Sequence, residues 1–350
     1  MATPPELSST KFDLTEDSPE AVFQFMLDQG WSDGLPVVPP TAGRVRGMLE
    51  YAQRDASEVV GYINPDAGSA TVEKIAVNAV MAGCLPAYLP VLIAAVQAIT
   101  EPEFNIHGLQ TTTNPVSPLL IINGPVREKI GLNSGRGTLG PGYRANATIG
   151  RAVRLLLLNI GGAKPWSTDM LVHGSPAKYI NCMGENEEDS VWEPLHVERG
   201  FSPGQSAVTV VGAQGFSNCL TFYKEPESFL TMIASAMADI SDNNYLLAAG
   251  NPLVILTPGH AQIFADRGYT KQMVKESLFE LCKVPIDRFP KETSVITYED
   301  GFAMDGDRVC PCQSADDIII VVSGGPEPYH VLYCGNFGDT TAVTKEIQLP

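Results

Sequence analysis

Short apolar runs alternate with longer segments typical of helices along the chain. Runs of strand length lie at 118–123, 207–212, 253–257 and 317–323, and a further strand is predicted at 330–333. The first helix is predicted to begin after Ser18, which caps it, with Pro19 in the first turn. Other helices are predicted at 41–53, 71–81, 86–99, 147–158, 226–240, 259–266 and 271–282. This alternation predicts an α/β fold in which helices flank a layered, mixed sheet.

The length of the chain, 350 residues, allows one large domain or two closely packed lobes. Residues 1–14 are polar and rich in proline, so we expect a loose N-terminal tail. A change of pattern near residue 205 divides the remainder into two parts. We expect a lobe at 15–205 that holds a loop rich in glycine and arginine, and a second α/β lobe at 206–350.

The net charge of −17 argues against nucleic acid or an acidic membrane surface as a partner. The longest apolar runs, such as 89–99, are too short to span a bilayer, and no secretory signal is visible near Met1. Seven cysteines form no regular framework, which is typical of free thiols in a reducing compartment. We therefore expect a cytoplasmic protein, and a chain of this size is often a symmetric homo-oligomer.

The stretch at 133–151 opens with four closely spaced glycines, at 135, 137, 140 and 142, and contains three arginines, at 136, 144 and 151. The glycines allow the backbone to turn its amides toward a ligand, and a helix that starts near Asn146 would add its positive end. This pattern predicts a pocket for a small anion. Because the chain as a whole is acidic, a local basic patch must attract that anion. The expected substrate-binding residues of this loop are Gly137, Gly140, Gly142, Arg144, Asn146 and Arg151.

Cys84 lies between two predicted helices, at the start of the second. A thiol at a helix N-terminus has a lowered pKa, so Cys84 is a candidate nucleophile. The alternative is a small buried residue in a corner between the two helices.

A dense polar run at 104–115 leads into the buried strand at 118–123. Loops at the ends of a sheet commonly hold ligands, so His107 is a candidate for proton transfer and Gln110 and Asn114 for substrate binding. The alternative is that these side chains satisfy the backbone of their own turn.

A third cluster of polar residues spans 173–199. His196 or Glu187 suits general acid–base chemistry, and Glu187 or Glu193 could orient a histidine. A divalent metal held by His173, His196 and Glu185 is an alternative, although no short ligand pair such as His-x-x-x-His supports it. The acidic residues also suit a solvated loop. Apart from that alternative metal, no cofactor is predicted. The glycine spacing at 135–140 matches a dinucleotide site by letter, but it follows its strand at a distance and no acidic residue closes a second strand about 20 residues later.

Several runs resemble a family of poorly characterised bacterial proteins that are linked, as neighbours or fusions, to small UGSC-type thiol or selenol domains. These runs lie at 31–40, 81–84, 107–110, 140–151 and 192–200, and they spread over most of the chain. The resemblance implies an association with thiol or selenol redox chemistry, which adds weight to Cys84. This chain contains no such cysteine-rich domain, so the resemblance implies a separate partner protein.

Three hypotheses follow. The first is an enzyme that binds a small carboxylate or phosphate and cleaves or forms a bond at a neighbouring carbon by thiol-assisted lyase or reductive chemistry. The second is a metal-dependent hydrolase or lyase. The third is a non-catalytic subunit that presents a substrate to a thiol- or selenol-bearing partner.

Overall fold

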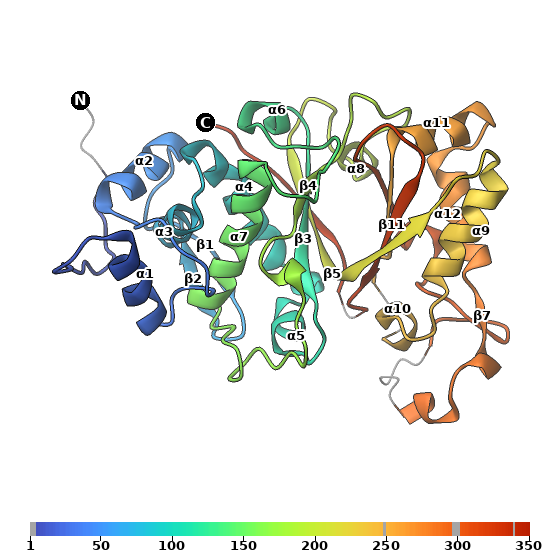
Figure 1. The fold of residues 1–350 in the computed structure, drawn as a ribbon, viewed down its shortest axis with the longest axis horizontal. Coiled ribbons are helices and arrows are strands. Elements are labelled where there is room, and N and C mark those ends of the chain that lie inside the picture. Colours follow the sequence, from blue (N-terminus) through green and yellow to red (C-terminus); the bar gives the residue numbers. More distant parts are fainter. Residues whose placement is uncertain (1–4, 248–249, 296–301, 339) are drawn as a thin grey trace.

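A mixed sheet forms the centre of the computed structural model, which describes residues 5–247, 250–295, 302–338 and 340–350 (Figure 1). Six of its strands follow the order β10 (Ile319–Val322), β6 (Leu253–Leu256), β11 (His330–Asn336), β5 (Ala207–Leu220), β3 (Ser117–Asn123) and β4 (Cys182–Gly184). A seventh strand, β12 (Val343–Glu346), also pairs with β5. The pairs β3–β4 and β6–β10 are parallel, and the other pairs are antiparallel.

Strand β5 joins the two halves of this sheet. Its first residues pair with β3 on one side and with β12 on the other, whereas its later residues pair with β11. The first seven residues of β5 are buried, and most of the later ones are not. The sheet is therefore continuous across the boundary predicted near residue 205, with strands from both expected lobes.

The sheet curls so that its two outer strands meet at one corner. The backbone N–H of Asn186, just after β4, donates to the carbonyl of Val322 in β10 at 2.7 Å. The Ser323 hydroxyl donates to the carbonyl of Gly184 at 2.8 Å. The carboxyl ends of β3, β4 and β10 consequently lie close together.

Alternate residues of each strand pack into different cores, as the period of two requires. Side chains such as Leu119, Ile121, Leu253 and Ile255 fill the space between the two halves of the curled sheet. Their neighbours in the same strands face outward and are covered by helices.

Two groups of helices cover the outer faces, one at each side of the sheet in Figure 1. Helices α2 (Ala42–Ala52), α3 (Val72–Ala82), α4 (Leu89–Ile99) and α7 (Arg144–Asn159) pack on the β3–β5 half. Helices α9 (Pro226–Met237), α11 (Pro258–Asp266) and α12 (Lys271–Leu281) pack on the β6–β10–β11 half.

The remaining elements are shorter or peripheral. The short helices are α5 (Ile106–Thr111), α6 (Val126–Ile130), α8 (Leu195–Glu198) and α10 (Asn243–Leu246), and α1 (Pro19–Asp28) lies near the N-terminus. A hairpin forms from β1 (Val59–Ile63) and β2 (Gly68–Thr71). A small sheet forms from β7 (Val284–Pro285), β9 (Arg308–Val309) and β8 (Met304–Asp305).

The predicted fold class is confirmed, because helices flank a layered mixed sheet. Ser18 caps α1 by accepting from the N–H of Ala21 at 3.2 Å, as expected. Residues 5–14 have no regular secondary structure, but Glu73 anchors them through bonds from Ser8 and Ser9. In the described part of the chain, no helix combines the length and the apolar character needed to cross a bilayer.

Candidate functional site

The glycine-rich loop is held by the side chain of Asn146. The Asn146 amide oxygen accepts from the N–H of Asn133 at 2.9 Å, and its NH₂ donates to the carbonyls of Asn133 and Thr138 at 2.9 and 3.1 Å. Gly137 and Gly142 adopt positive φ angles of 76° and 111°, which favour glycine. The amide of Asn146 is thus occupied by the loop itself, while Gly137, Gly140 and Gly142 lie exposed.

The three arginines of this loop all bind protein groups. Arg144 donates twice to the carbonyl of Gly83, at 3.0 and 2.8 Å, and so caps the C-terminus of α3. Arg151 forms a bidentate pair with Asp33 at 2.9 and 2.8 Å. Arg136 pairs with Glu327. Arg144 and Arg151 both lie close enough to Cys84 to act on its thiol, but Arg151 is neutralised by Asp33 and Arg136 by Glu327. The convergence of the guanidinium groups on an anion pocket stays a prediction.

Cys84 lies in the core and not at an exposed helix start. It follows the C-terminal end of α3, and its thiol donates to the carbonyl of Thr148 at 3.3 Å. Burial raises the pKa of the Cys84 thiol to about 12, although the charges of Arg144 and Arg151 act in the opposite direction. The expectation of a lowered pKa is wrong, because burial and the negative end of α3 both disfavour a thiolate. A catalytic role for Cys84 stays a prediction.

A second group of polar side chains lies where β3, β4 and β10 end. We call Asn123, Arg127, Glu185, Glu187 and His196 the strand-end cluster. Asn123 donates to Glu185 at 2.7 Å and to Glu187 at 2.9 Å. Glu185 is fully buried, and burial raises the pKa of its carboxyl. Arg127 lies 3.1 Å from Glu187, so the two charges are paired.

His196 is the buried imidazole of the strand-end cluster. Its ring nitrogens form no hydrogen bond of good geometry with the described residues, although the backbone of Ser202 and Pro203 is close enough to raise its pKa. Burial lowers the pKa of His196, and the charge of Glu187 opposes that shift. The structure therefore brings three predicted residues, His196, Glu185 and Glu187, into one cluster, and among the described residues no hydrogen bond joins the imidazole to either carboxylate.

The other predicted residues lie elsewhere. His107 is exposed on α5, and Asn114 bonds to Thr112 within its own turn at 3.2 and 3.3 Å. Glu193 is exposed, and its carbonyl accepts from Lys271 at 2.7 Å. His173 is exposed in the segment after α7. Asn114 thus fits the alternative interpretation, in which the polar side chains of 104–115 form hydrogen bonds within their own turn.

The metal alternative required His173, His196 and Glu185 to share one site. Among the described residues, no group of three or more histidine, cysteine, aspartate or glutamate side chains is placed to hold a metal ion. His173 lines a surface groove, whereas His196 and Glu185 are buried at the strand ends. The three residues therefore do not form the predicted ligand set.

The largest cavity described here is a groove of about 480 Å³ between α7 and the irregular segment 164–180. We call it the α7 groove. Its volume is typical of sites for small molecules. Its charged and titratable lining comes from Arg154 of α7, from Asp33 after α1, and from Asp169, His173, Lys178 and Tyr179 of the segment. Trp166, which is 80% exposed, lines it as well.

Two cations share one carboxylate in the α7 groove. Lys178 donates to both oxygens of Asp169 at 2.8 Å, and Arg154 lies 3.4 Å from the same carboxylate. The Asp169 side chain is completely buried, whereas those of Lys178 and Arg154 keep 9% and 12% of their exposure. Burial lowers the pKa of Lys178, and Asp169 opposes this shift. Asp33 of the lining is paired with Arg151, so Arg154 and Lys178 share the single carboxylate of Asp169 and leave one positive charge in excess.

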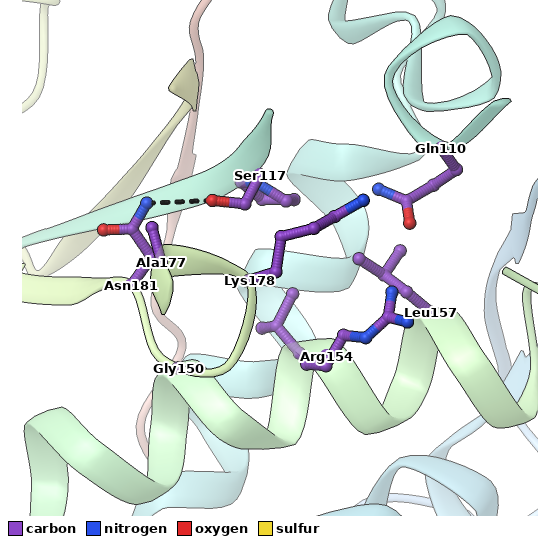
Figure 2. A pocket seen from close by; sticks show the side chains of 10 residues that line it. Gln110, Ser117, Gly150, Arg154, Leu157, Ala177, Lys178 and Asn181 are labelled. Atoms are coloured by element: carbon purple, nitrogen blue, oxygen red, sulfur yellow. Dashed lines mark hydrogen bonds between the residues drawn. The ribbon is translucent and has the colours of Figure 1, made fainter. Parts of the chain in front are cut away.

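A small pocket adjoins the groove and shares Arg154 and Lys178 with it (Figure 2). Its volume of about 10 Å³ is close to the space of one water molecule. Gln110 lines it with a side chain that is 0% exposed, and neither amide atom of Gln110 has a partner among the described residues. Figure 2 shows the Lys178 side chain extending toward the Gln110 amide. The predicted substrate-binding residue Gln110 therefore lies beside a cationic groove.

The sequence did not single out Arg154 and Asp169. Arg154 follows Arg151 by three residues on the same helix, which was a signal that both could face one side. Asp169 stands in an irregular segment with no motif around it.

Comparisons of the chain with protein-family models and with curated proteins find no match. The site is therefore argued from its geometry.

Proposed function

We propose that the chain is an enzyme that binds a small carboxylate- or phosphate-bearing molecule in the α7 groove and cleaves or forms a bond at a neighbouring carbon. The observation that carries the proposal is the pair of cations, Arg154 and Lys178, on the single buried carboxylate of Asp169. In a protein with a net charge of −17, such a local excess of positive charge is what an anionic substrate needs.

Arg154 keeps donors for a ligand. A guanidinium has five N–H donors, and Arg154 uses one toward Asp169 at 3.4 Å and one toward the carbonyl of Ala163 at 3.3 Å. Both contacts are long, so a carboxylate or phosphate in the groove can form shorter, bidentate bonds with this side chain. Trp166 and Tyr179, both exposed at the groove, offer apolar surface for the rest of the molecule.

The groove, and not Cys84, is the centre of this proposal. A thiol that is buried and hydrogen-bonded to Thr148 is poorly placed to attack a substrate. Lys178, Asp169 and His173 supply amine, carboxylate and imidazole groups at the groove, which are the usual groups for proton transfer next to an anion.

The proposal is tested by calorimetric titration of the whole protein with a panel of small carboxylates and phosphates. Arg154→Gln should weaken the best ligand about 10-fold or more, because it removes a charge-assisted bidentate contact. Arg267→Gln is the control, since Arg267 pairs with Glu225 at the surface and does not line the groove. Equal affinities of both variants and the wild type for every binding anion would refute the groove as the site.

A second candidate function is a subunit that presents its ligand to a thiol- or selenol-bearing partner. All seven cysteines of the chain are buried, so a reacting thiol would have to come from another molecule. The segment beside the groove also exposes apolar side chains that a partner could cover, namely Trp166, Met170, Val172, Tyr179 and Ile180.

The two candidates differ in their need for an external thiol. The presenting-subunit hypothesis expects the isolated chain to bind an anion from the panel and to form product only after a dithiol such as dithiothreitol is added. Product formation by the chain alone favours the first proposal.

A further inference from the structure

We propose that Lys178 is an amine nucleophile that forms an imine with the carbonyl carbon of a small oxo acid, whose carboxylate Arg154 holds in the α7 groove. This inference rests on the proposed function and names its substrate class. It also explains why the groove contains both an arginine and a lysine. The planar guanidinium of Arg154 suits a carboxylate, whereas the primary amine of Lys178 can add to a carbonyl.

Lys178 is placed where such a reaction needs it. It ends a short 3-10 turn, Pro176–Lys178, and its side chain lines both the α7 groove and the small pocket. Its nitrogen lies 2.8 Å from each oxygen of Asp169, so a proton acceptor is already in contact with the amine. Figure 2 shows the side chains of Lys178 and Arg154 over the same stretch of α7, on the side that Gln110 faces.

Two side chains beside the groove lack a full partner. Asp169 is neutralised by Lys178 at 2.8 Å, and Arg154 reaches the same carboxylate only at 3.4 Å. Gln110 keeps a buried amide without partners at the same place, and an unsatisfied buried polar group is unfavourable. An oxo acid in the α7 groove would supply an anion for Arg154, while the Gln110 amide lies in the adjoining pocket, which has room for about one water molecule.

Burial supports this chemistry because it favours the neutral amine. Desolvation lowers the pKa of Lys178, and the charge of Arg154 acts in the same direction, against the effect of Asp169. Lysines that are desolvated or placed beside another cation are typical amine nucleophiles.

The step balances without any oxidant or reductant. Asp169 accepts a proton from the Lys178 ammonium, and the freed electron pair forms a C–N bond to the carbonyl carbon. The former carbonyl oxygen receives that proton and the second amine proton, and it departs as water. One ammonium and one oxo acid thus yield one protonated imine and one water. The protonated imine withdraws electrons from the adjacent carbon, where the proposed function places bond cleavage or formation.

The test uses the full chain with pyruvate as the probe and borohydride to reduce any imine. Peptide mass spectrometry should find one reduced pyruvate adduct, located at Lys178. Lactate carries the same carboxylate without a carbonyl, so it should bind, compete with pyruvate and form no adduct. Lys275 is the internal control, because it is as buried as Lys178 in its pairing with Glu198 but lines neither cavity.

Lys178→Arg keeps the positive charge and removes the nucleophile. The variant should still bind lactate in calorimetric titration and should give no pyruvate adduct. Melting curves of the variant and the wild type check that the variant is folded. The adduct is measured on the wild-type chain, so the test remains valid even if the variant does not fold.

The outcomes separate this inference from the proposed function. If pyruvate and lactate bind and Arg154→Gln weakens them, but the adduct is absent or spread over exposed lysines such as Lys164, the imine is refuted and the anion groove stands. If neither acid binds the protein, both proposals for this substrate class fail.

Discussion

Replacement of Asp169 by asparagine is the most direct perturbation of the α7 groove. Asparagine has nearly the same shape as aspartate, so the change removes a charge and leaves the packing in place. The Asp169 side chain is fully buried, and its two cationic partners, Lys178 and Arg154, are about nine-tenths buried. The variant therefore leaves two largely buried positive charges without a carboxylate.

The structure allows the size of this effect to be estimated. Removing one partner of a buried ion pair costs about 3–5 kcal/mol of unfolding free energy. Lys178 and Arg154 line an open groove, where water screens them in part, so we expect about 3 kcal/mol for Asp169→Asn. The backbone bonds of Asp169, from Trp166 at 3.2 Å and to Lys164 at 3.0 Å, are unaffected by this change.

Urea unfolding measures the loss, with Asp305→Asn as the control. The Asp305 side chain is 64% exposed, and its partner Lys283 keeps a second carboxylate, that of Glu280, so this change leaves no cation unpaired. The control should therefore unfold near the wild-type midpoint, while Asp169→Asn unfolds at clearly lower urea.

Added anions provide a second, more specific signature. Because Lys178 and Arg154 line the groove, phosphate or pyruvate bound there should stabilise Asp169→Asn more than the wild type by supplying a negative charge to the two cations. If Asp169→Asn unfolds like the wild type, or if anions stabilise both proteins equally, the cations of the groove are not held as we describe.

Three further predictions concern other parts of the molecule. Cys84, with a pKa of about 12 and a buried thiol, should react with iodoacetamide at pH 8 only after unfolding, and rapid labelling of the native protein at Cys84 would contradict its burial. Gly150→Ala should lower the melting temperature, because its new Cβ would meet the backbone nitrogen of Asn181 at 2.7 Å, whereas Gly47→Ala meets nothing within 4 Å and should stabilise α2 by about 0.5–1 kcal/mol. Burial raises the pKa of Asp242 from 3.8 to about 6, so its contribution to stability is greatest below pH 3.8 and declines up to about pH 6. Asp242→Asn should remove a decline of about 3 kcal/mol over that range, as urea unfolding at several pH values would show, and an unchanged pH profile would speak against the shift.

Part of the fold was predictable because its signals are local. Strand β3 is buried at all seven positions, and its apolar run identifies it without knowledge of its partners. Strand β4 was not predicted, since three residues carry no pattern and only the pairing with β3 defines them. Strand β5 continues beyond the predicted residue 212 to Leu220, because β11 pairs with a stretch that is no longer uniformly apolar.

The candidate site was predictable only in its residue types. Gln110 was expected to bind substrate and lies beside the α7 groove, whereas Arg144 and Arg151 were expected to bind an anion and instead bind Gly83 and Asp33. Those acceptors lie 61 and 118 residues away in the sequence, so no local pattern could show which partners the two arginines have. Arg154, one turn from Arg151 on α7, keeps the longer and weaker contacts.

The sequence by itself determined the helices, the main strands and the α/β class, because backbone preferences and the period of apolar residues act over a few neighbouring positions. It also showed that an acidic chain contains arginine, lysine and glutamine side chains of the types that bind anions. Only the tertiary structure decided which cations are neutralised and which face a groove, because charge compensation and burial depend on residues that the curled sheet and α7 bring together from distant parts of the chain.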